Sequence, residues 1–127
     1  MAILTTVDGH QITFNPKAVS ALTNHNASTG QVVTTVYGIT NAAIDITETA
    51  QAFMSRLGIA NNFAQLTRPN GSPVWLNGSA VSSLRPPLPN QYVAGVNTVV
   101  STDGLTQGVT ETPAAVTAAI NAHGGNL

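Results

Sequence analysis

Short apolar and β-branched runs, separated by turns that contain glycine or asparagine, make up most of this chain. Residues 12–14 (Ile-Thr-Phe) and 74–76 (Val-Trp-Leu) alternate or run apolar over a few positions, which is typical of half-buried strands. Residues 32–37 and 96–102 are rich in β-branched side chains, which favour extended backbone. The pattern therefore predicts a β-rich protein built from short strands.

Two dipeptides and two asparagines mark the turns between these runs. Asp-Gly at 8–9 and Asn-Gly at 70–71 predict tight hairpin turns, because glycine tolerates positive φ and the Asx side chain hydrogen-bonds locally. Asn15 and Asn77 are predicted to cap short helical turns, with Pro16 at a favourable first position in one of them.

Two helices are predicted, one near the middle of the chain and one near its end. Thr49 and Thr112 are suitable N-caps, and Gly58 and Gly124 are suitable helix stops. Apolar residues at helical spacing define one face of the first helix, and the second helix has a corresponding set at the matching positions. These faces are Ala50, Phe53, Met54 and Leu57 in the first helix, and Pro113, Val116, Thr117 and Ile120 in the second.

The chain resembles itself along its length. Residues 4–22 align with residues 66–84, at an offset of 62. The identical pairs are Leu4/Leu66, Thr5/Thr67, Gly9/Gly71, Asn15/Asn77, Ala18/Ala80, Val19/Val81, Ser20/Ser82 and Leu22/Leu84. The similarity resumes downstream, where residues 33–38 match residues 99–104 at an offset of 66, and Ile-Thr-Glu-Thr at 46–49 matches Val-Thr-Glu-Thr at 109–112 at an offset of 63.

Each half is therefore predicted to contain turn, strand, short turn, strand, turn, strand and helix. The sequence predicts a β-rich α+β fold with an internal duplication: two copies of a hairpin, strand and C-terminal helix unit, residues 1–60 and 61–127, related by a pseudo-two-fold axis. Because about 60 residues alone bury little apolar area, the two copies are expected to share one core.

This order of elements resembles the flagellar FlbD-type small proteins. The matching residues are Asn-Gly at 70–71, Phe-Asn-Pro at 14–16, Leu-Asn-Gly at 76–78, and Thr-Glu-Thr at 47–49 and 110–112. The resemblance implies the fold of the unit, and it raises the alternative of a cytoplasmic adaptor or regulator that binds another protein.

Uncharged polar side chains must make most of the surface contacts with water. Only 7% of residues are charged and the formal net charge is −1, whereas about 25% of residues are charged in a typical soluble protein. Thr, Asn, Ser and Gln supply 43 of the 127 residues. Because so little charge protects weakly against self-association, we expect a homo-oligomer or a protein that packs against neighbours; a soluble monomer is the alternative. The composition also resembles phage virion structural proteins, capsid decoration proteins included.

Several partner classes fit poorly. The four cations Lys17, Arg56, Arg68 and Arg85 are scattered, whereas nucleic-acid phosphates require clustered cations. No stretch approaches the ~18 apolar residues of a membrane span, and the first residues lack the features of a secretion signal. Cysteine is absent, which excludes disulfides and thiolate chemistry.

The sequence contains no motif that indicates catalysis, a metal or a cofactor. His10, His25 and His123 have no second ligand at metal-binding spacing and are interpreted as solvated loop residues. Glu48 and Glu111 are the two acids that occur in both halves and could face one another as glycosidase acids do. The simpler interpretation places each at a helix N-terminus, where negative charge is favoured. An enzyme is not expected.

A proline-rich segment is the candidate partner contact. Arg85, Pro86, Pro87, Leu88 and Pro89 match a proline-rich docking peptide in outline. A stiff extended surface loop is the simpler interpretation. Such a loop would lose little entropy on contact with a partner, because proline fixes φ in advance.

These features favour a virion structural protein, one that decorates or cements a phage capsid through contacts with the major capsid protein or other virion proteins. Its expected location is the virion, after assembly in the host cytoplasm. The cytoplasmic adaptor is the alternative.

Overall fold

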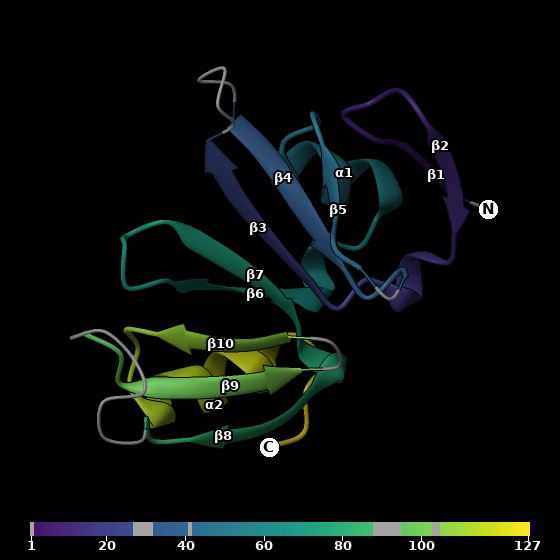
Figure 1. The fold of residues 1–127 in the computed structure, drawn as a ribbon. Helices are drawn as coiled ribbons and strands as arrows, with labels where there is room; N and C mark the ends of the chain where they lie inside the picture. Colours follow the sequence, from purple (N-terminus) through teal and green to yellow (C-terminus); the bar gives the residue numbers. More distant parts are fainter. Residues whose placement is uncertain (1, 27–31, 41, 88–94, 103–104) are drawn as a thin grey trace.

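The computed structural model describes residues 2–26, 32–40, 42–87, 95–102 and 105–127, and it has a β-rich α+β fold (Figure 1). Its strands are β1 (Ala2–Thr5), β2 (Gln11–Phe14), β3 (Ala21–Asn26), β4 (Val32–Tyr37), β5 (Ile44–Ile46), β6 (Phe63–Thr67), β7 (Pro73–Asn77), β8 (Val81–Arg85), β9 (Thr98–Thr102) and β10 (Leu105–Val109). The helices are α1 (Ala50–Leu57) and α2 (Pro113–Ala122), and short 3-10 turns are η1 (Pro16–Ala18), η2 (Ala60–Asn62) and η3 (Gly78–Ala80).

The strands form three antiparallel sheets. β1 and β2 are a hairpin, β5-β4-β3-β7-β6 is a five-stranded sheet, and β10-β9-β8 is a three-stranded sheet. Further backbone contacts link the sheets: Thr6 forms a β-bridge with Ile46, the Val7 amide donates to the Asp45 carbonyl at 3.1 Å, and the Thr110 amide donates to the Thr67 carbonyl at 2.9 Å. Taken with these links the strands follow one another in the order β2-β1-β5-β4-β3-β7-β6-β10-β9-β8, in which β1 and β5, like β6 and β10, meet only near their ends and form no ladder. Strands β2 and β8 stand at the two ends of this order, and Figure 1 shows them on opposite sides of the molecule.

The predicted turns and caps are present. Gly9 and Gly71 have positive φ (90° and 86°) at the hairpin turns, as the Asp-Gly and Asn-Gly dipeptides predict. Asn15 caps η1 and Asn77 caps η3 through their side-chain oxygens. The helices are capped in the same way, because Thr49 accepts from the Ala52 amide and Thr112 from the Ala115 amide.

The same succession of elements occurs in residues 2–57, called here the first segment, and in residues 63–122, the second segment. Each segment contains a hairpin, a 3-10 turn, a three-stranded meander and a helix. The hairpins share one register, since Ala2 pairs with Phe14 and Ala64 with Leu76, and both pairs keep the offset of 62 found for residues 4–22 and 66–84.

The alignment of the central strands needs one correction. Leu22 pairs with Val36 and Leu84 with Val100. The Thr34 and Thr98 hydroxyls donate to the carbonyls that precede the two helix caps, at 2.7 and 2.8 Å. Both observations give an offset of 64 between β4 and β9, not 66. A shift of two positions leaves every side chain on the same face of a strand, so the apolar pattern alone does not distinguish the two registers.

The pairing between the segments is not reciprocal. β3 of the first segment pairs with β7 of the second. A two-fold axis would also pair the corresponding strands β8 and β2, and these lie in different sheets. The pseudo-two-fold axis therefore stays a prediction that this pairing does not support.

The buried side chains form two clusters, and the shared core of the two copies stays a prediction. One cluster lies between α1, the β1–β2 hairpin and one face of the five-stranded sheet, with Phe53 and Leu22 fully buried in it. The other lies between α2, β6, β7 and the three-stranded sheet, with Val116 and Ile120 fully buried. Strands β3 and β7 form the boundary, because alternate residues face opposite clusters: Leu22 faces the first and Ala21 the second. Of the predicted helix faces, Leu57 is only partly buried, Thr117 is half-buried and Pro113 is exposed.

Candidate interaction surface

The proline-rich segment begins where β8 ends. Arg85 is the last residue of β8, and its guanidinium donates to the Pro86 carbonyl at 3.3 Å. Pro86 is exposed and Pro87 is half-buried, while Leu88 and Pro89 lie outside the described residues. Because proline has no amide hydrogen, Pro86 and Pro87 are poor strand formers and mark the end of β8.

Strand β8 forms an outer edge of the three-stranded sheet. It pairs with β9 on one side, and in the described part of the chain no strand pairs with its other side. Ser82 and Ser83 are exposed, and Leu84 is half-buried against the second cluster. An edge strand presents backbone amides and carbonyls that can hydrogen-bond to another strand. The described part of the predicted partner contact, residues 85–87, therefore lies at the end of a strand whose outer side has no described partner.

Strand β2 forms the corresponding edge at the other end of the molecule. It pairs with β1, and no described strand lies along its outer side. Gln11 and Thr13 are exposed, whereas Ile12 is half-buried and Phe14 is buried. None of these four residues is proline, so the β2 amides that point away from β1 can donate hydrogen bonds to another strand.

The joint between β3 and β7 shows how such edges meet in this protein. Ala21 pairs with Leu76, Leu22 with Trp75 and Thr23 with Val74. All six residues are buried. This short three-pair ladder connects the two segments.

Asn77 fastens the end of that ladder. Its backbone amide donates to the Ser20 carbonyl at 2.8 Å, and its side-chain Nδ2 donates to the Val19 carbonyl at 2.9 Å. Its Oδ1 accepts from the amide and the hydroxyl of Ser79, at 3.1 and 2.9 Å. With 6% of its surface exposed, Asn77 satisfies its polar atoms inside the protein, as a buried amide must.

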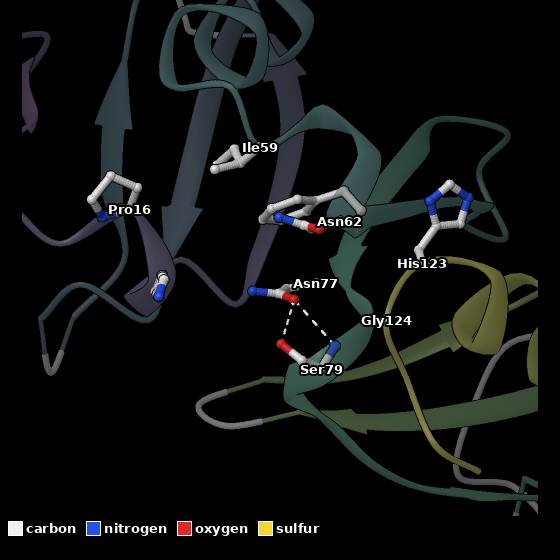
Figure 2. A pocket seen from close by; sticks show the side chains of 9 residues that line it. Pro16, Ile59, Asn62, Asn77, Ser79, His123 and Gly124 are labelled. Carbon is white, nitrogen blue, oxygen red and sulfur yellow. Dashed lines mark hydrogen bonds between the residues drawn. The ribbon is translucent and has the colours of Figure 1, made fainter.

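A pocket of about 230 Å³ lies beside this joint (Figure 2). It is lined by Pro16, Lys17, Ile59, Asn62, Phe63, Asn77, Ser79, His123 and Gly124. The dashed lines in Figure 2 show that Asn77 is already bonded to Ser79. The His123 ring is engaged as well, with Nδ1 2.9 Å from the Asn61 carbonyl oxygen. Among these lining residues none is a carboxylate, so the pocket does not bring a histidine to an acid.

The two repeated glutamates hold each helix to its hairpin. Glu48 forms a two-point ion pair with Arg56 at 2.9 and 3.0 Å, and Arg56 also donates to the Ile3 carbonyl in β1 at 3.0 Å. The bond to Glu48 raises the pKa of Arg56 above its ordinary value. Glu111 accepts from the Thr67 amide in β6 at 3.0 Å. Each glutamate therefore has a structural partner within its own segment.

The first hairpin turn carries an exposed acid–histidine pair. Asp8 and His10 approach to 3.2 Å, with 65% and 79% of their side chains exposed. The Thr6 hydroxyl donates to Asp8, and this bond, assisted by the nearby His10, holds the pKa of Asp8 below its ordinary value. The side chain of His25 lies outside the described residues.

No family model matches the chain, and neither a curated protein nor a solved structure was found to match it. Across the described ranges, no helix has both the length and the apolar character of a membrane span. Within the same residues, histidines and carboxylates do not gather in groups of three or more that suit a metal ion.

Sequence reasoning did not identify the two open edges. Asn15, Val81 and Ser82 repeat residues of the β3–β7 joint, and these identities were visible in the alignment. These identities point to a second possible joint only once it is known that Asn77 contacts Val19 and Ser20, and only the fold shows that contact.

Proposed function

We propose that the chain is a virion structural protein, a decoration or cement protein of a phage capsid that binds the major capsid protein or other virion proteins. The observation that carries the proposal is the charged fraction of 7%, with Thr, Asn, Ser and Gln in place of charges. Charged residues are depleted at the centres of protein interfaces, because buried charges lose their hydration. A surface of neutral hydroxyls and amides suits a protein that is surrounded by others.

The open edges of β2 and β8 support this proposal. Within the described residues no strand pairs with the outer side of β2 or of β8, and the proline-containing segment follows β8 directly. Edge strands and stiff loops are two surfaces through which proteins bind one another without pockets or cofactors. Arg85, Pro86, Pro87, Leu88 and Pro89 are the proposed partner contact, and the chain is proposed to form homo-oligomers.

The proposal includes an internal duplication, with units at residues 1–60 and 61–127. The repeated order of elements, the shared hairpin register and the matched helix caps support it. A duplicated unit gives a structural protein two similar faces from one gene product. The proposed role is not enzymatic and needs no cofactor, and the proposed location is the virion after assembly in the host cytoplasm.

Mass spectrometry of purified particles tests this function. We expect the chain in intact virions at a fixed ratio to the major capsid protein, in a copy number that matches a site on the shell. Particles washed at high salt should keep it, because neutral contacts are screened little by ions. Virions that lack the chain would refute the proposal.

A cytoplasmic adaptor of the FlbD kind is the second candidate. The observation that favours it is the order of the unit: a tight turn, an asparagine-capped turn and a helix begun by Thr-Glu-Thr at 47–49 and 110–112. This role predicts dispersed monomers in size-exclusion chromatography and one cellular protein that co-purifies with the tagged chain.

A further inference from the structure

The joint between β3 and β7 uses residues that the chain contains twice. Asn77 donates to the carbonyls of Val19 and Ser20 at this joint. In the alignment of the two halves, Asn77 corresponds to Asn15, and Val19 and Ser20 correspond to Val81 and Ser82. All three residues are identical to their counterparts. The counterparts lie on the two open edges, with Asn15 at the end of β2 and the other two in β8.

The joint that these counterparts suit cannot form within one described molecule. β8 and β2 belong to different sheets and stand at opposite ends of the strand order. Figure 1 shows β8 along the lower edge of the molecule and the β1–β2 hairpin at the upper right. A second copy of the chain can supply the missing strand to each edge.

We propose that copies of this chain associate head to tail, with β8 of one copy pairing antiparallel to β2 of the next as β3 pairs with β7 inside each copy. The expected register follows from the internal joint: Ser83 lies opposite Phe14 of the next copy, Leu84 opposite Thr13, and Arg85 opposite Ile12. The Asn15 backbone amide then donates to the Ser82 carbonyl of the other copy, and the Asn15 side-chain Nδ2 donates to the Val81 carbonyl.

The exposure of these residues agrees with this role. Asn77 is buried in the internal joint, whereas Asn15, its counterpart, is exposed although it caps η1 in the same way. Trp75 is buried opposite Leu22, whereas Thr13, at the position of Trp75, is exposed. Asn15 and Thr13 are thus available on the surface at the β2 edge.

Two differences make the joint between copies weaker than the internal one. Thr13 lacks the large apolar surface of Trp75, so less area is buried. β8 also has a bulge at Ser82, whose hydroxyl donates to the Ser101 carbonyl. The bulge precedes Ser83. The residues that correspond to the paired part of β3, Ser83 to Arg85, therefore lie beyond the bulge in a regular stretch of strand. We therefore expect a reversible contact that strengthens when many copies are held close together.

The contact is heterologous, because the two partners use different surfaces. An open assembly always has one free β8 edge at one end and one free β2 edge at the other, so it grows until rotation between copies closes a ring. This inference goes beyond the proposed function, since it concerns contacts between copies of the chain and holds whichever other protein the chain binds.

Engineered disulfides test the register. The chain has no cysteine of its own, so the double variant Leu84→Cys/Thr13→Cys can crosslink only through the introduced thiols. Directly opposed residues of antiparallel strands have Cα atoms within the range that a disulfide spans. We expect a ladder of products at multiples of 13.0 kDa on non-reducing gels. The control is Leu84→Cys/Thr5→Cys, whose second thiol lies in β1, away from the open edge, and it should crosslink little.

Sedimentation velocity tests the contact without crosslinks. Between about 10 µM and about 1 mM the wild-type chain should shift from monomer to larger species. Thr13→Lys places a charge at the centre of the joint and should lower the association constant at least about tenfold. Thr5→Lys, which adds the same charge to an exposed position of the same hairpin, should leave it unchanged. Circular dichroism checks that both variants are folded.

The inference is overturned if the wild-type chain stays monomeric over this range, if Thr13→Lys and Thr5→Lys associate equally, or if the two cysteine pairs crosslink to the same extent. These outcomes are separate from those of the virion experiment. A chain found in virions that is monomeric in solution leaves the proposed function standing and removes the head-to-tail joint.

Discussion

At the scale of single residues, the turn of the first hairpin shows how a neutral hydroxyl tunes an acid. The Thr6 hydroxyl donates to Asp8 and lowers its pKa. The Thr6 oxygen also accepts from the His10 amide at 3.0 Å, so one side chain organises the turn. The corresponding turn of the second segment uses Asn70, which accepts from the Ser72 amide and hydroxyl.

Replacement of Thr6 by valine tests this arrangement. A carboxyl group whose pKa is lowered in the folded state stabilises the fold above its unfolded pKa, and this contribution is lost as the pH falls through the folded value. Thr6→Val should return the pKa of Asp8 toward its ordinary value, measured by NMR titration of the carboxyl carbon. The stability difference between wild type and variant should shrink on acidification below about pH 4. An unchanged Asp8 titration would contradict the assigned cause.

The two repeated asparagines provide a matched pair of substitutions. Asn77→Ala removes a buried donor and acceptor and leaves the Val19 carbonyl without its partner, so it should reduce the free energy of unfolding by about 2–3 kcal/mol. Asn15→Ala removes the cap of η1 at an exposed position and should cost no more than about 1 kcal/mol. Urea unfolding of dilute monomer gives both values. Equal losses would show that Asn77 does not fasten the internal joint.

At the scale of elements, the sequence was most informative where local chemistry decides the structure. The caps at Asn15, Asn77, Thr49 and Thr112 were predicted correctly, because a short polar side chain before a helical turn satisfies free amides whatever the rest of the fold does. The glycine turns were predicted for the same reason, since their backbone conformation excludes most other residues.

The strands that the sequence did not indicate are β1, β5, β6 and β10. They are three to five residues long, and β10 contains Gly108, which disfavours strands. Such segments become extended because neighbouring strands hydrogen-bond to them. The local sequence pattern does not show which strand will be the neighbour, so it does not predict the segment. The open edges of β2 and β8 were not predictable for the same reason, because an edge is defined by the strand that is missing beside it.

At the scale of the whole molecule, the two apolar clusters divide the protein into parts that meet along β3 and β7. Phe53 belongs to the first cluster and Ile120 to the second. Phe53 stacks on Phe14 within its own cluster, with ring centroids 5.9 Å apart. The division implies that changes in different clusters act independently on stability.

Double-mutant cycles test that independence. Phe53→Leu and Ile120→Val should each cost about 1 kcal/mol, and their effects should add to within about 0.5 kcal/mol. Phe53→Leu combined with Phe14→Leu should depart from additivity by about 0.5–1.5 kcal/mol, because both changes remove one ring–ring contact. Chemical denaturation provides the four-point cycles. Strong coupling between Phe53 and Ile120 would indicate a single core after all.

The pairing of β3 with β7 also has a consequence for synthesis on the ribosome. Ala21 pairs with Leu76, so the outer side of β3 has no partner until the second segment has emerged from the exit tunnel. On a crowded polysome, β7 of a neighbouring nascent chain can occupy that place first, which yields a domain-swapped product with the same local contacts. Slow elongation between the two segments would therefore increase the fraction of swapped chains.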